Sequence, residues 1–405
     1  FFSNLAMHHV PLYLDPNINH FFWIPAAVLV GFVCTLLTLA LLFHILAHVP
    51  IFNGPMQAWA RWHPFKRCKP SRLHTLTMDF VPAICDLNVA EAGVCLLWVG
   101  ALLLTTRLPY VGITGRMVAF ALGTVLLPVT RNSIWAQFMG RSFDRVIMFH
   151  RWAGRTTVVL TIAHCITKIY QRGIGTLFQL EWTVWGFGGA SGAIAGLLMM
   201  AVALFALEPV RVRRYSWFYW SHLLALPAIV FAMMHAKAVL WVMVPSLTLY
   251  VLDKSVQLVR YCTPHIVVSA TALYGACRLT VRRTDGRPYC FAAGQYFYLR
   301  VPRADGGTGL VGLAHPFSAV CAPGSTNLTF LLKDMGPGTF THRLRDLAGQ
   351  AAPLFVRLDG PYGRAHPPER YRCVYLVSSG IGVTPMLSLS GHILILLQAG
   401  AGSPE

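Results

Sequence analysis

Four histidines lie inside two apolar segments, and their spacing suits two metal centres. His150 and His164 are 14 residues apart, and His222 and His235 are 13 residues apart. At about 1.5 Å per helical residue these separations span about 21 and 20 Å, so each pair would place one imidazole toward each side of a hydrocarbon layer about 30 Å thick. Imidazole is a common axial ligand of haem iron. Two such helices side by side would hold two haems stacked across a membrane.

The helical phase differs between the two pairs. Fourteen residues at about 100° each return to within about 40° of the start, so His150 and His164 share a helix face. Thirteen residues fall about 140° short, so the second pair needs a local break, and Pro227 lies between His222 and His235. Two alternatives stay open: each imidazole bonds a neighbouring helix separately, or the four carry protons in a transporter without haem.

The composition is that of a membrane protein. The chain has 405 residues, of which 55% are hydrophobic and 12% charged, with a mean hydropathy of +0.55. The third of the predicted spans is short, and a tight turn around residues 236–238 separates the last two. We predict about seven transmembrane helices, at residues 23–48, 84–105, 116–131, 148–169, 186–207, 218–236 and 238–258.

Basic residues predict the orientation of these spans. The loops on one side hold eleven: Arg61, Lys66, Arg67, Lys69, Arg72, Arg131, Arg141, Arg145, Arg211, Arg213 and Arg214. The other side holds five: Arg107, Arg116, Lys168, Arg172 and Lys237. The basic side is expected to be cytosolic, which leaves the N-terminus outside and the C-terminal third inside. Much of the net charge of +18 follows from this asymmetry, so it does not indicate a nucleic-acid partner.

The remaining metal-binding residue types predict no further site. The ten cysteines show neither a CxxC nor a zinc-type Cys/His spacing, and they indicate no disulfide framework. His8, His9 and His20 would face the exterior, where solvated histidines without a role are the favoured interpretation over a metal site.

From about Cys262 the pattern changes to short β-prone runs separated by turn residues such as Asp285-Gly286 and the stretch 304–309. Six short strands at this spacing favour a β-barrel or sandwich. The predicted strands are HIVVSATAL, CRLTVRR, QYFYLRVP, NLTFLLKD, LFVRLDG and CVYLVSS.

Three motifs on this framework suit a nucleotide cofactor. The first is His315-Pro316-Phe317-Ser318, whose ring and hydroxyl would face a flat cofactor, although a plain strand entry reads the same way. The second is KDMGPGTFTHRL, where glycines and hydroxyls before a helix suit a pyrophosphate. The third, GIGVTP at residues 380–385, follows the strand CVYLVSS in a turn that lets a phosphate approach, but it is not a full GxGxxG. The candidate residues of the last two motifs are Gly336, Gly338, Thr339 and Thr341, and Gly380, Gly382, Thr384 and Pro385.

These pieces occur in an order that resembles the ferric reductase and NADPH oxidase superfamily. The ordered set is the histidine double pair, LLPVTRN (126–132), FHRWAGR (149–155), HPFS, GPYG (360–363) and GIGVTP, and it covers residues 84–390. The resemblance implies a membrane all-α bundle with a six-helix core that holds two b-type haems, followed by a cytosolic β-barrel FAD domain and an α/β NADPH-binding lobe.

The resemblance also implies roles for single residues. His150 with His222 would ligate the cytosolic-side haem, and His164 with His235 the outer one. His315 to Ser318 would contact the flavin and Gly336 to Thr341 its pyrophosphate. The flavin domain would also use Gly360 and Gly363, and Gly380 to Pro385 would open the NADPH site. Arg151 and Arg155 follow His150 closely, and we expect them, with Arg131 as a further candidate, to pair with haem propionates, ordinary cytosolic anchoring being the alternative.

The sequence departs from the family pattern in two places. An additional helix at residues 23–48 precedes the core, and this helix and the FHRWxG motif are more similar to metalloreductases. The family's NADPH lobe continues far beyond GIGVTP, whereas only 20 residues follow Pro385. A parallel βαβ lobe needs more chain than that. Either the sequence is a fragment, or NADPH binding is weak or supplied in trans. NADPH is therefore expected to bind weakly to residues 1–405.

The function that the sequence predicts is transmembrane electron transfer. An NADPH-dependent oxidoreductase of the ferric-chelate reductase type, in the plasma membrane, would pass electrons through FAD and two haems to exterior Fe(III) or Cu(II). Dioxygen, reduced to superoxide, is the alternative acceptor, and a non-catalytic haem-binding subunit is the alternative class. The expected domains are an exterior segment (1–22), an extra helix with a cytosolic loop (23–82), the haem domain (83–260), the FAD barrel (263–370) and the start of the NADPH lobe (371–405).

Overall fold

A computed structural model describes residues 27–35, 38, 87, 89–107, 112–131, 143–183, 186–300, 314–348, 355–363, 368–371 and 373–401. The chain forms two compact units. The first consists of Phe1–Gly140 and Asp144–Val251, and the second of Arg141–Phe143 and Leu252–Glu405. Each unit is described by itself below.

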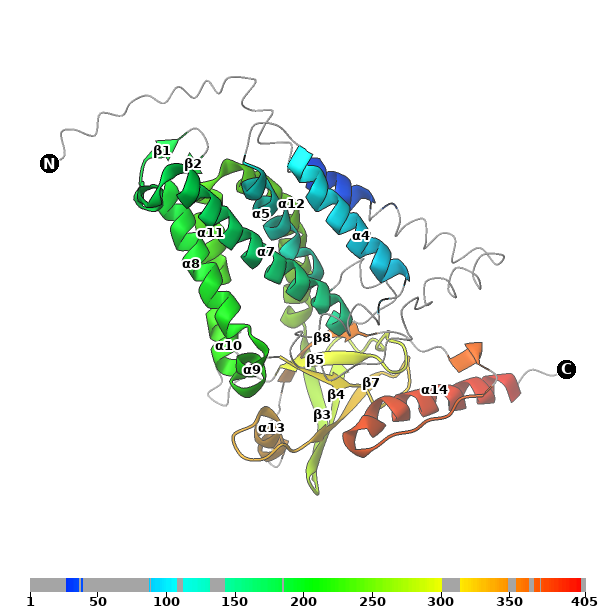
Figure 1. Cartoon of the computed structure of the whole chain (residues 1–405). Coiled ribbons are helices and arrows are strands. Elements are labelled where there is room, and N and C mark those ends of the chain that lie inside the picture. Colours follow the sequence, from blue (N-terminus) through cyan, green and yellow to red (C-terminus); the bar gives the residue numbers. More distant parts are fainter. Residues whose placement is uncertain are drawn as a thin grey trace, which may run out of the picture. The chain divides into compact units, whose positions relative to one another are not determined.

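The first unit is helical (Figure 1). Its long helices run in apolar sequence, and residues 27–35 are helical as well. Short 3-10 turns, η2 (Thr105–Arg107), η3 (Leu127–Val129) and η4 (Ile174–Phe178), follow α4, α5 and α7, and a two-stranded hairpin of β1 (Trp182–Thr183) and β2 (Gly186–Phe187) precedes α8. The helices are α4 (Val89–Leu104), α5 (Ile113–Val125), α7 (Phe143–Arg172), α8 (Gly189–Phe205), α9 (Glu208–Arg213), α10 (Tyr215–His222), α11 (Ala225–His235) and α12 (Lys237–Cys262). The first residue of α7 and the part of α12 from Leu252 belong to the second unit.

Each predicted span contains a helix among its described residues. Four helical stretches of the described chain are long and apolar enough to cross a membrane: Val89–Arg107, Tyr215–His235, Lys237–Cys262 and Gly380–Ala399. Ile113–Val129 and Gly189–Phe205 are shorter apolar helices. The long helix α7 is not among the four, because arginines and lysines interrupt its apolar residues. The described residues therefore form a membrane-type helical region, and the first span continues outside them.

Helix packing in this unit depends on close approach at small residues. Gly123 of α5 lies against Val242 of α12, and a Cβ at position 123 would collide with the valine side chain. Ser246 of α12 also donates its hydroxyl to the carbonyl oxygen of Gly123. Small residues and interhelical hydrogen bonds are the usual means of helix association in lipid. Leu29, Phe120, Ile229 and Val242 belong to the buried cluster at this contact, whereas Leu96 of α4 and Leu197 of α8 are exposed, as lipid-facing residues would be.

The break expected between His222 and His235 is present. Helix α10 ends at His222, a turn follows at Leu223 and Leu224, and α11 begins at Ala225. Pro227 occupies the first turn of α11, where a missing N–H leaves no intrahelical hydrogen bond unmade. The proline thus permits a new helix to start there, and this changes the phase between the two histidines.

The second unit is built on one antiparallel six-stranded sheet of order β6-β5-β8-β3-β4-β7. An isolated bridge, Ala319 with Phe330, also joins the end of β6 to β7, so the two outer strands of that order meet. Two helices and two 3-10 turns accompany the sheet among the described residues: α13 (Phe340–Ala348), η5 (Pro368–Arg370), η6 (Gly380–Gly382) and α14 (Val383–Ala401). The strands are β3 (Pro264–Leu273), β4 (Ala276–Arg283), β5 (Tyr296–Arg300), β6 (His315–Ser318), β7 (Asn327–Lys333) and β8 (Phe355–Tyr362).

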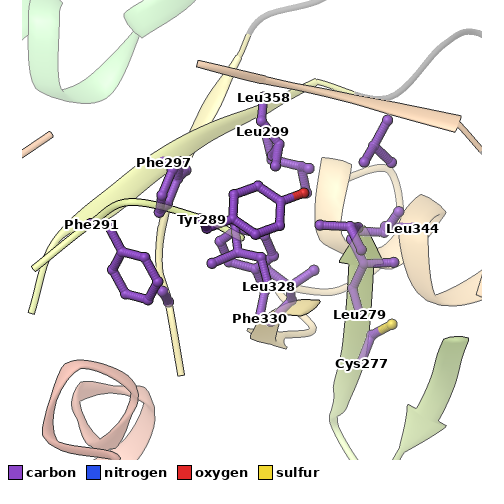
Figure 2. Packing of buried hydrophobic residues seen from close by; sticks show 14 residues of the cluster. Cys277, Leu279, Tyr289, Phe291, Phe297, Leu299, Leu328, Phe330, Leu344 and Leu358 are labelled. Carbon is purple, nitrogen blue, oxygen red and sulfur yellow. The ribbon is translucent and has the colours of Figure 1, made fainter. Parts of the chain in front are cut away.

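The core of this sheet forms because buried and less buried residues alternate along its strands. Buried and less buried residues alternate in β4, β5 and β7, which is the period of two that a one-sided sheet requires. Leu279, Phe330 and Leu299 from these strands are fully buried together, and Leu344 of α13 closes one side of the cluster (Figure 2). Truncating such a side chain to alanine costs about 2–5 kcal/mol of folding free energy. The sheet is therefore a stable platform for the motifs on its strands and loops.

One predicted strand is wrong. Residues 373–379, CVYLVSS, form no strand and lie exposed, whereas HPFS, for which a strand was only the alternative interpretation, forms β6. A strand needs a neighbour to satisfy its backbone, and among the described residues CVYLVSS has none, while β6 pairs with β5 along its whole length. The other five predicted strands are confirmed. The turn at 304–309 lies outside the described residues, as do His8, His9 and His20 and the basic loop 61–72.

Candidate functional site

The four histidines meet as two facing pairs in the helical unit. The ring of His150 on α7 lies 6.0 Å from that of His222 on α10, centroid to centroid, with 73° between the ring planes. His164, farther along α7, lies 6.5 Å from His235 on α11, with 71° between the planes. The spacing on α7 and the break between α10 and α11 thus bring together the pairs that the sequence predicted.

Three of the four imidazoles are held at Nδ1. His150 donates to the carbonyl oxygen of Val125 at 2.8 Å, and His235 donates to that of Gly188 at 3.0 Å. His164 Nδ1 lies 3.0 Å from the hydroxyl of Thr114. The buried Nδ1 of His222 has no hydrogen-bond partner in the described part of the chain. A hydrogen bond at Nδ1 fixes the tautomer and leaves Nε2 as the coordinating atom, which is the usual arrangement of a histidine ligand.

The separations fit one metal ion between each pair. A metal–imidazole bond is about 2 Å long, so two imidazoles on opposite sides of an ion have coordinating nitrogens about 4 Å apart and ring centroids roughly 6 Å apart. The observed 6.0 and 6.5 Å match this geometry. No group of three or more His, Cys, Asp or Glu side chains that could hold a metal ion occurs among the described residues, so neither pair has the ligand set of a zinc site. Two imidazoles per site suit a haem iron.

Glycines permit the close approach of helices at the second pair. A Cβ on Gly192 of α8 would lie 2.7 Å from Cε1 and Nδ1 of His235. A Cβ on Gly115 of α5 would lie 3.2 Å from Cε1 of His164. The first position excludes any side chain, so α8 supports the His235 ring with its backbone alone.

A second group of predicted residues converges on the sheet. His315 and Phe317 of β6 both stack on Phe340 at the start of α13, with centroids 4.4 and 6.1 Å apart. This contact joins the HPFS motif to the loop that contains Gly336, Gly338, Thr339 and Thr341. Gly336 and Gly338 have positive φ, and a Cβ on either would meet no atom within 4 Å, so the backbone of this loop is open on that side. Burial, followed by the charge of Arg343, lowers the pKa of His315 below its ordinary value.

Asp334 organises that loop, and the sequence prediction missed it. Its carboxylate accepts hydrogen bonds from the backbone N–H of Gly336 at 2.9 Å, from His342 Nδ1 at 3.0 Å and from Arg345 at 2.9 Å. The Gly336 amide, then His342 and Arg345, lower the pKa of Asp334 to about 2. Thr341 completes the turn by accepting a hydrogen bond from the N–H of Met335 at 3.1 Å. An acid directly before a glycine-rich turn was the available signal.

The GPYG motif reaches the same region through β5. Gln295 donates to the carbonyl oxygen of Gly363 at 3.0 Å, and a Cβ on Gly363 would lie 3.1 Å from the ring of Tyr296, which pairs with Ser318 in the sheet. Tyr362 donates its hydroxyl to the buried carboxylate of Asp359 at 2.8 Å. Gly360 and Gly363 both have positive φ, so glycine is required at both ends of this turn. HPFS, the Gly336 loop and GPYG therefore lie around one edge of the sheet.

The GIGVTP motif lies beside β7, at the turn into α14. Gly380 to Gly382 form η6, and α14 starts at Val383, as the predicted glycine turn into a helix requires. Thr384 donates to the carbonyl oxygen of Ile381 at 3.0 Å, and Pro385 lies in the first turn. Ser388 donates to the carbonyl oxygen of Cys321 at 2.8 Å and so ties α14 to the chain beyond β6. Gly380 and Gly382 are exposed.

The fold and these sites define a class: a membrane-type helical protein with two facing histidine pairs, joined to an antiparallel sheet. Residues 114–233 match the family described as Ferric reductase like transmembrane component. Dual oxidase 1 of Rattus norvegicus is 28% identical over 320 residues, which cover 68% of this chain and 20% of that protein. Ferric reduction oxidase 7, chloroplastic, of Arabidopsis thaliana is 27% identical over 297 residues, which cover 67% of this chain and 38% of that protein.

Solved structures give weaker similarities. The flavohemoglobin from Malassezia yamatoensis with bound FAD and heme has a TM-score of 0.27 and 17% identity, over 68% of this chain and 69% of that one. A ferredoxin NADP+ reductase from Neisseria gonorrhoeae with bound FAD and NADP has a TM-score of 0.26 and 18% identity, over 33% and 52%. At these scores neither similarity supports an argument about this chain.

The chain carries a ferric-reductase-like transmembrane component and is homologous to ferric reduction oxidases and to dual oxidases of the NADPH oxidase family. It spans 20% and 38% of the length of the two relatives named above. The histidine pairs all lie in or beside the matched region 114–233, since only His235 follows its last residue.

Proposed function

We propose that this chain is a transmembrane oxidoreductase that passes electrons from cytosolic NADPH, by way of FAD and two b-type haems, to an acceptor on the exterior. Fe(III) or Cu(II) is the first choice of acceptor, in the plasma membrane. The observation that carries the proposal is the pair of facing imidazole couples, at 6.0 and 6.5 Å, on helices that match a ferric-reductase-like component. The positive-inside distribution of arginine and lysine supports a cytosolic C-terminal unit.

The helices hold the ligands before any cofactor binds. His150 and His222 would ligate the haem on the cytosolic side, and His164 and His235 the outer haem. Val125 and Gly188 lie on backbone segments that fix two of these rings, so little reorganisation is needed when iron is coordinated. Haem and FAD, when bound, would supply the one-electron and two-electron redox chemistry. Arg151 and Arg155, which follow His150 on α7, are proposed to pair with haem propionates, as is Arg131.

The sheet would hold FAD at the edge where three motifs meet. Pro316, Phe317 and Ser318 would line the ring site, and the open backbone at Gly336 and Gly338 would accept the pyrophosphate, with Thr339 and Thr341 beside it. The bridge between β6 and β7 supports a closed barrel as the form of this domain. Gly380, Gly382, Thr384 and Pro385 would begin the NADPH site.

Two other functions remain in competition with the first. Dioxygen would replace the metal ion as acceptor in a superoxide-generating oxidase, and the similarity to dual oxidase 1 favours this alternative as directly as ferric reduction oxidase 7 favours the first. A non-catalytic haem-binding subunit would keep both haems without oxidising NADPH by itself.

The haem assignment is tested by counting haem in the purified chain. A pyridine haemochrome assay should give two haems per wild-type chain, and the absorption spectrum of the native protein should be that of a low-spin, bis-imidazole haem. His164→Ala or His235→Ala should remove the outer haem, and His392→Ala, which changes a histidine of α14, should keep both. Absence of haem from well-folded protein supplied with haem would falsify the assignment.

The flavin and nicotinamide assignments need a separate measurement. FAD fluorescence quenching should give a measurable affinity for FAD, and added NADPH should reduce the haems. Absence of FAD binding would contradict the flavin assignment, and absence of NADPH-driven haem reduction in protein that binds FAD would contradict the nicotinamide assignment. Reduction of a ferric chelate, compared with superoxide formation under the same chemical reductant, would then distinguish the two acceptors.

A further inference from the structure

A basic and aromatic segment lies at the start of the span that carries His222. Three arginines lie within four residues here: Arg211 and Arg213 on α9, and Arg214 between α9 and α10. Glu208 is the acid among residues 208–220. The side chains of Arg213 and Arg214 are exposed. Arg211 lies 3.7 Å from Glu208, so the glutamate offsets one of the three positive charges. We call residues 208–220 the basic–aromatic segment.

Large apolar rings accompany these arginines on the outside of the unit. Tyr215, Trp217 and Trp220 are 55%, 63% and 65% exposed, although Trp217 also contacts the ring of Phe205 at 6.4 Å and Tyr215 that of Phe218 at 5.7 Å. Val212 is 68% exposed beside them. Exposed tryptophan and tyrosine rings in a row are unfavourable in water, but they are typical of the boundary between lipid headgroups and acyl chains.

The position of the segment along the chain agrees with that boundary. The apolar stretch long enough to cross a membrane runs from Tyr215 to His235, so Arg213 and Arg214 directly precede it. The arginines would therefore lie at headgroup depth and the rings of Trp217 and Trp220 one to two turns deeper. A planar guanidinium binds phosphate oxygens in pairs, and each basic residue near an anionic leaflet strengthens binding about fivefold.

We propose that the basic–aromatic segment is a binding site for anionic phospholipid headgroups, with Arg213 and Arg214 on the phosphate and Trp217 and Trp220 anchored among the adjacent acyl chains. The charge, the exposed rings and the position at the end of a span all match this partner. An acidic protein would match the arginines, but it would not account for the exposed indoles at membrane depth. The proposal does not depend on haem, FAD or NADPH.

The test is tryptophan quenching by brominated lipids. The full chain is reconstituted in phosphatidylcholine vesicles that contain a minor, fixed fraction of either brominated phosphatidylserine or brominated phosphatidylcholine. We expect several-fold stronger quenching by the serine lipid at low salt, and a loss of that preference at high salt because the charges are screened. The double variant Trp217→Phe with Trp220→Phe should remove most of the difference, because these indoles report on the segment.

Charge variants decide whether the arginines are responsible. Arg213→Gln with Arg214→Gln should abolish the preference, whereas Arg278→Gln with Arg282→Gln, which removes the same charge from exposed positions on β4, should leave it unchanged. The proposal would be overturned if the Arg213→Gln, Arg214→Gln variant kept the preference for the serine lipid, or if both lipids quenched the wild-type chain equally. An acidic protein would then be the better candidate for the partner of the segment. Soluble glycerol phosphate should not compete, and loss of the preference in its presence would show a free-phosphate site instead. Circular dichroism of each variant confirms that the helices are intact.

Discussion

Gly192 on α8 lies directly against the imidazole of His235 on α11, so close that a Cβ would lie 2.7 Å from two ring atoms. The imidazole of His235 also donates a hydrogen bond to the carbonyl oxygen of Gly188, so the ring cannot move aside without losing that bond. Gly192→Ala is therefore expected to displace His235 and to lower the haem count from two to one per chain. Pyridine haemochrome and the reduced-minus-oxidised spectrum give the count.

A matched control lies one turn farther along the same helix. A Cβ on Gly196 would meet Thr161 Cγ2 at 3.8 Å and Cys165 Sγ at 4.0 Å, which are ordinary contacts. Gly196→Ala should therefore keep both haems. If the two variants lose haem equally, the close approach at Gly192 is not what supports the outer site.

We expect the hydrogen bond between Thr114 and His164 to influence the midpoint potential of the outer haem. Loss of a hydrogen bond to a ligating histidine weakens its orientation and typically lowers metal affinity about 10–100-fold. Thr114→Val should therefore shift the midpoint potential of the outer haem and loosen its binding, while the inner haem keeps its potential. Thr114→Ser retains the hydroxyl and should restore the wild-type titration in a spectroelectrochemical measurement. Equal titrations of the valine and serine variants would show that this bond has no such role.

Asp334 is expected to act as a positioning residue for FAD. It holds the N–H of Gly336, His342 and Arg345 together, so Asp334→Asn should weaken FAD binding by about tenfold through loss of the charge-assisted contacts. The carboxylate has a pKa of about 2, below the ordinary 3.8, so its contribution is complete above about pH 4 and is lost only as the pH falls toward 2. FAD affinity, measured by fluorescence quenching, should therefore not change through this group between neutral pH and pH 5.

Asp346 provides the control for that variant. It lies on α13, the helix that carries His342 and Arg345, it is exposed, and its carboxylate is 3.8 Å from His342. Asp346→Asn should leave FAD affinity within about twofold of wild type, since exposed ion pairs contribute little. A similar loss of affinity in both variants would indicate a general charge effect and not the loop.

We expect the buried His265 to make the folding stability of the sheet decrease at acid pH. It is 6% exposed, stacks on Tyr289 at 5.9 Å, and its Nδ1 has no partner among the described residues. Burial, then the charge of Arg283, lowers the pKa of His265 to about 4, which the backbone at Thr263 and the charge of Asp285 oppose. Since the unfolded chain protonates this histidine near pH 6.5, stability is complete above that pH. It should fall by up to about 3 kcal/mol as the pH drops to 4.

Urea unfolding of the sheet, followed by its tyrosine fluorescence at several pH values, measures this dependence. His265→Phe keeps a ring against Tyr289 and removes the titrating group, so its stability should change little between pH 6.5 and 4.5. A variant whose stability still falls as steeply as that of the wild type would place the acid sensitivity elsewhere.

The sequence by itself predicted the elements whose signal is local. Helices appear wherever long apolar runs occur, because a backbone in lipid must satisfy its own hydrogen bonds. His150 and His164 share a face of α7 because they are 14 residues apart, and this follows from the helical period without any tertiary contact. Short β-prone runs between turn residues predicted β3, β4, β5, β7 and β8, because such runs favour extended backbone whatever their partners are. The family resemblance, carried by ordered motifs, was likewise a property of the sequence.

Only the tertiary structure decided how these pieces meet. The pairing of His150 with His222 and of His164 with His235 depends on where α10 stops and α11 begins, a choice made by packing and not by Pro227 alone. CVYLVSS has the composition of a strand but no neighbour among the described residues, and HPFS became a strand because β5 lies beside it. The sequence places Asp334 before a glycine-rich turn, but only the fold shows its role, because its partners His342 and Arg345 reach it once α13 folds back on the loop. Local patterns fix the elements, but long-range contacts select among the partners that each element permits.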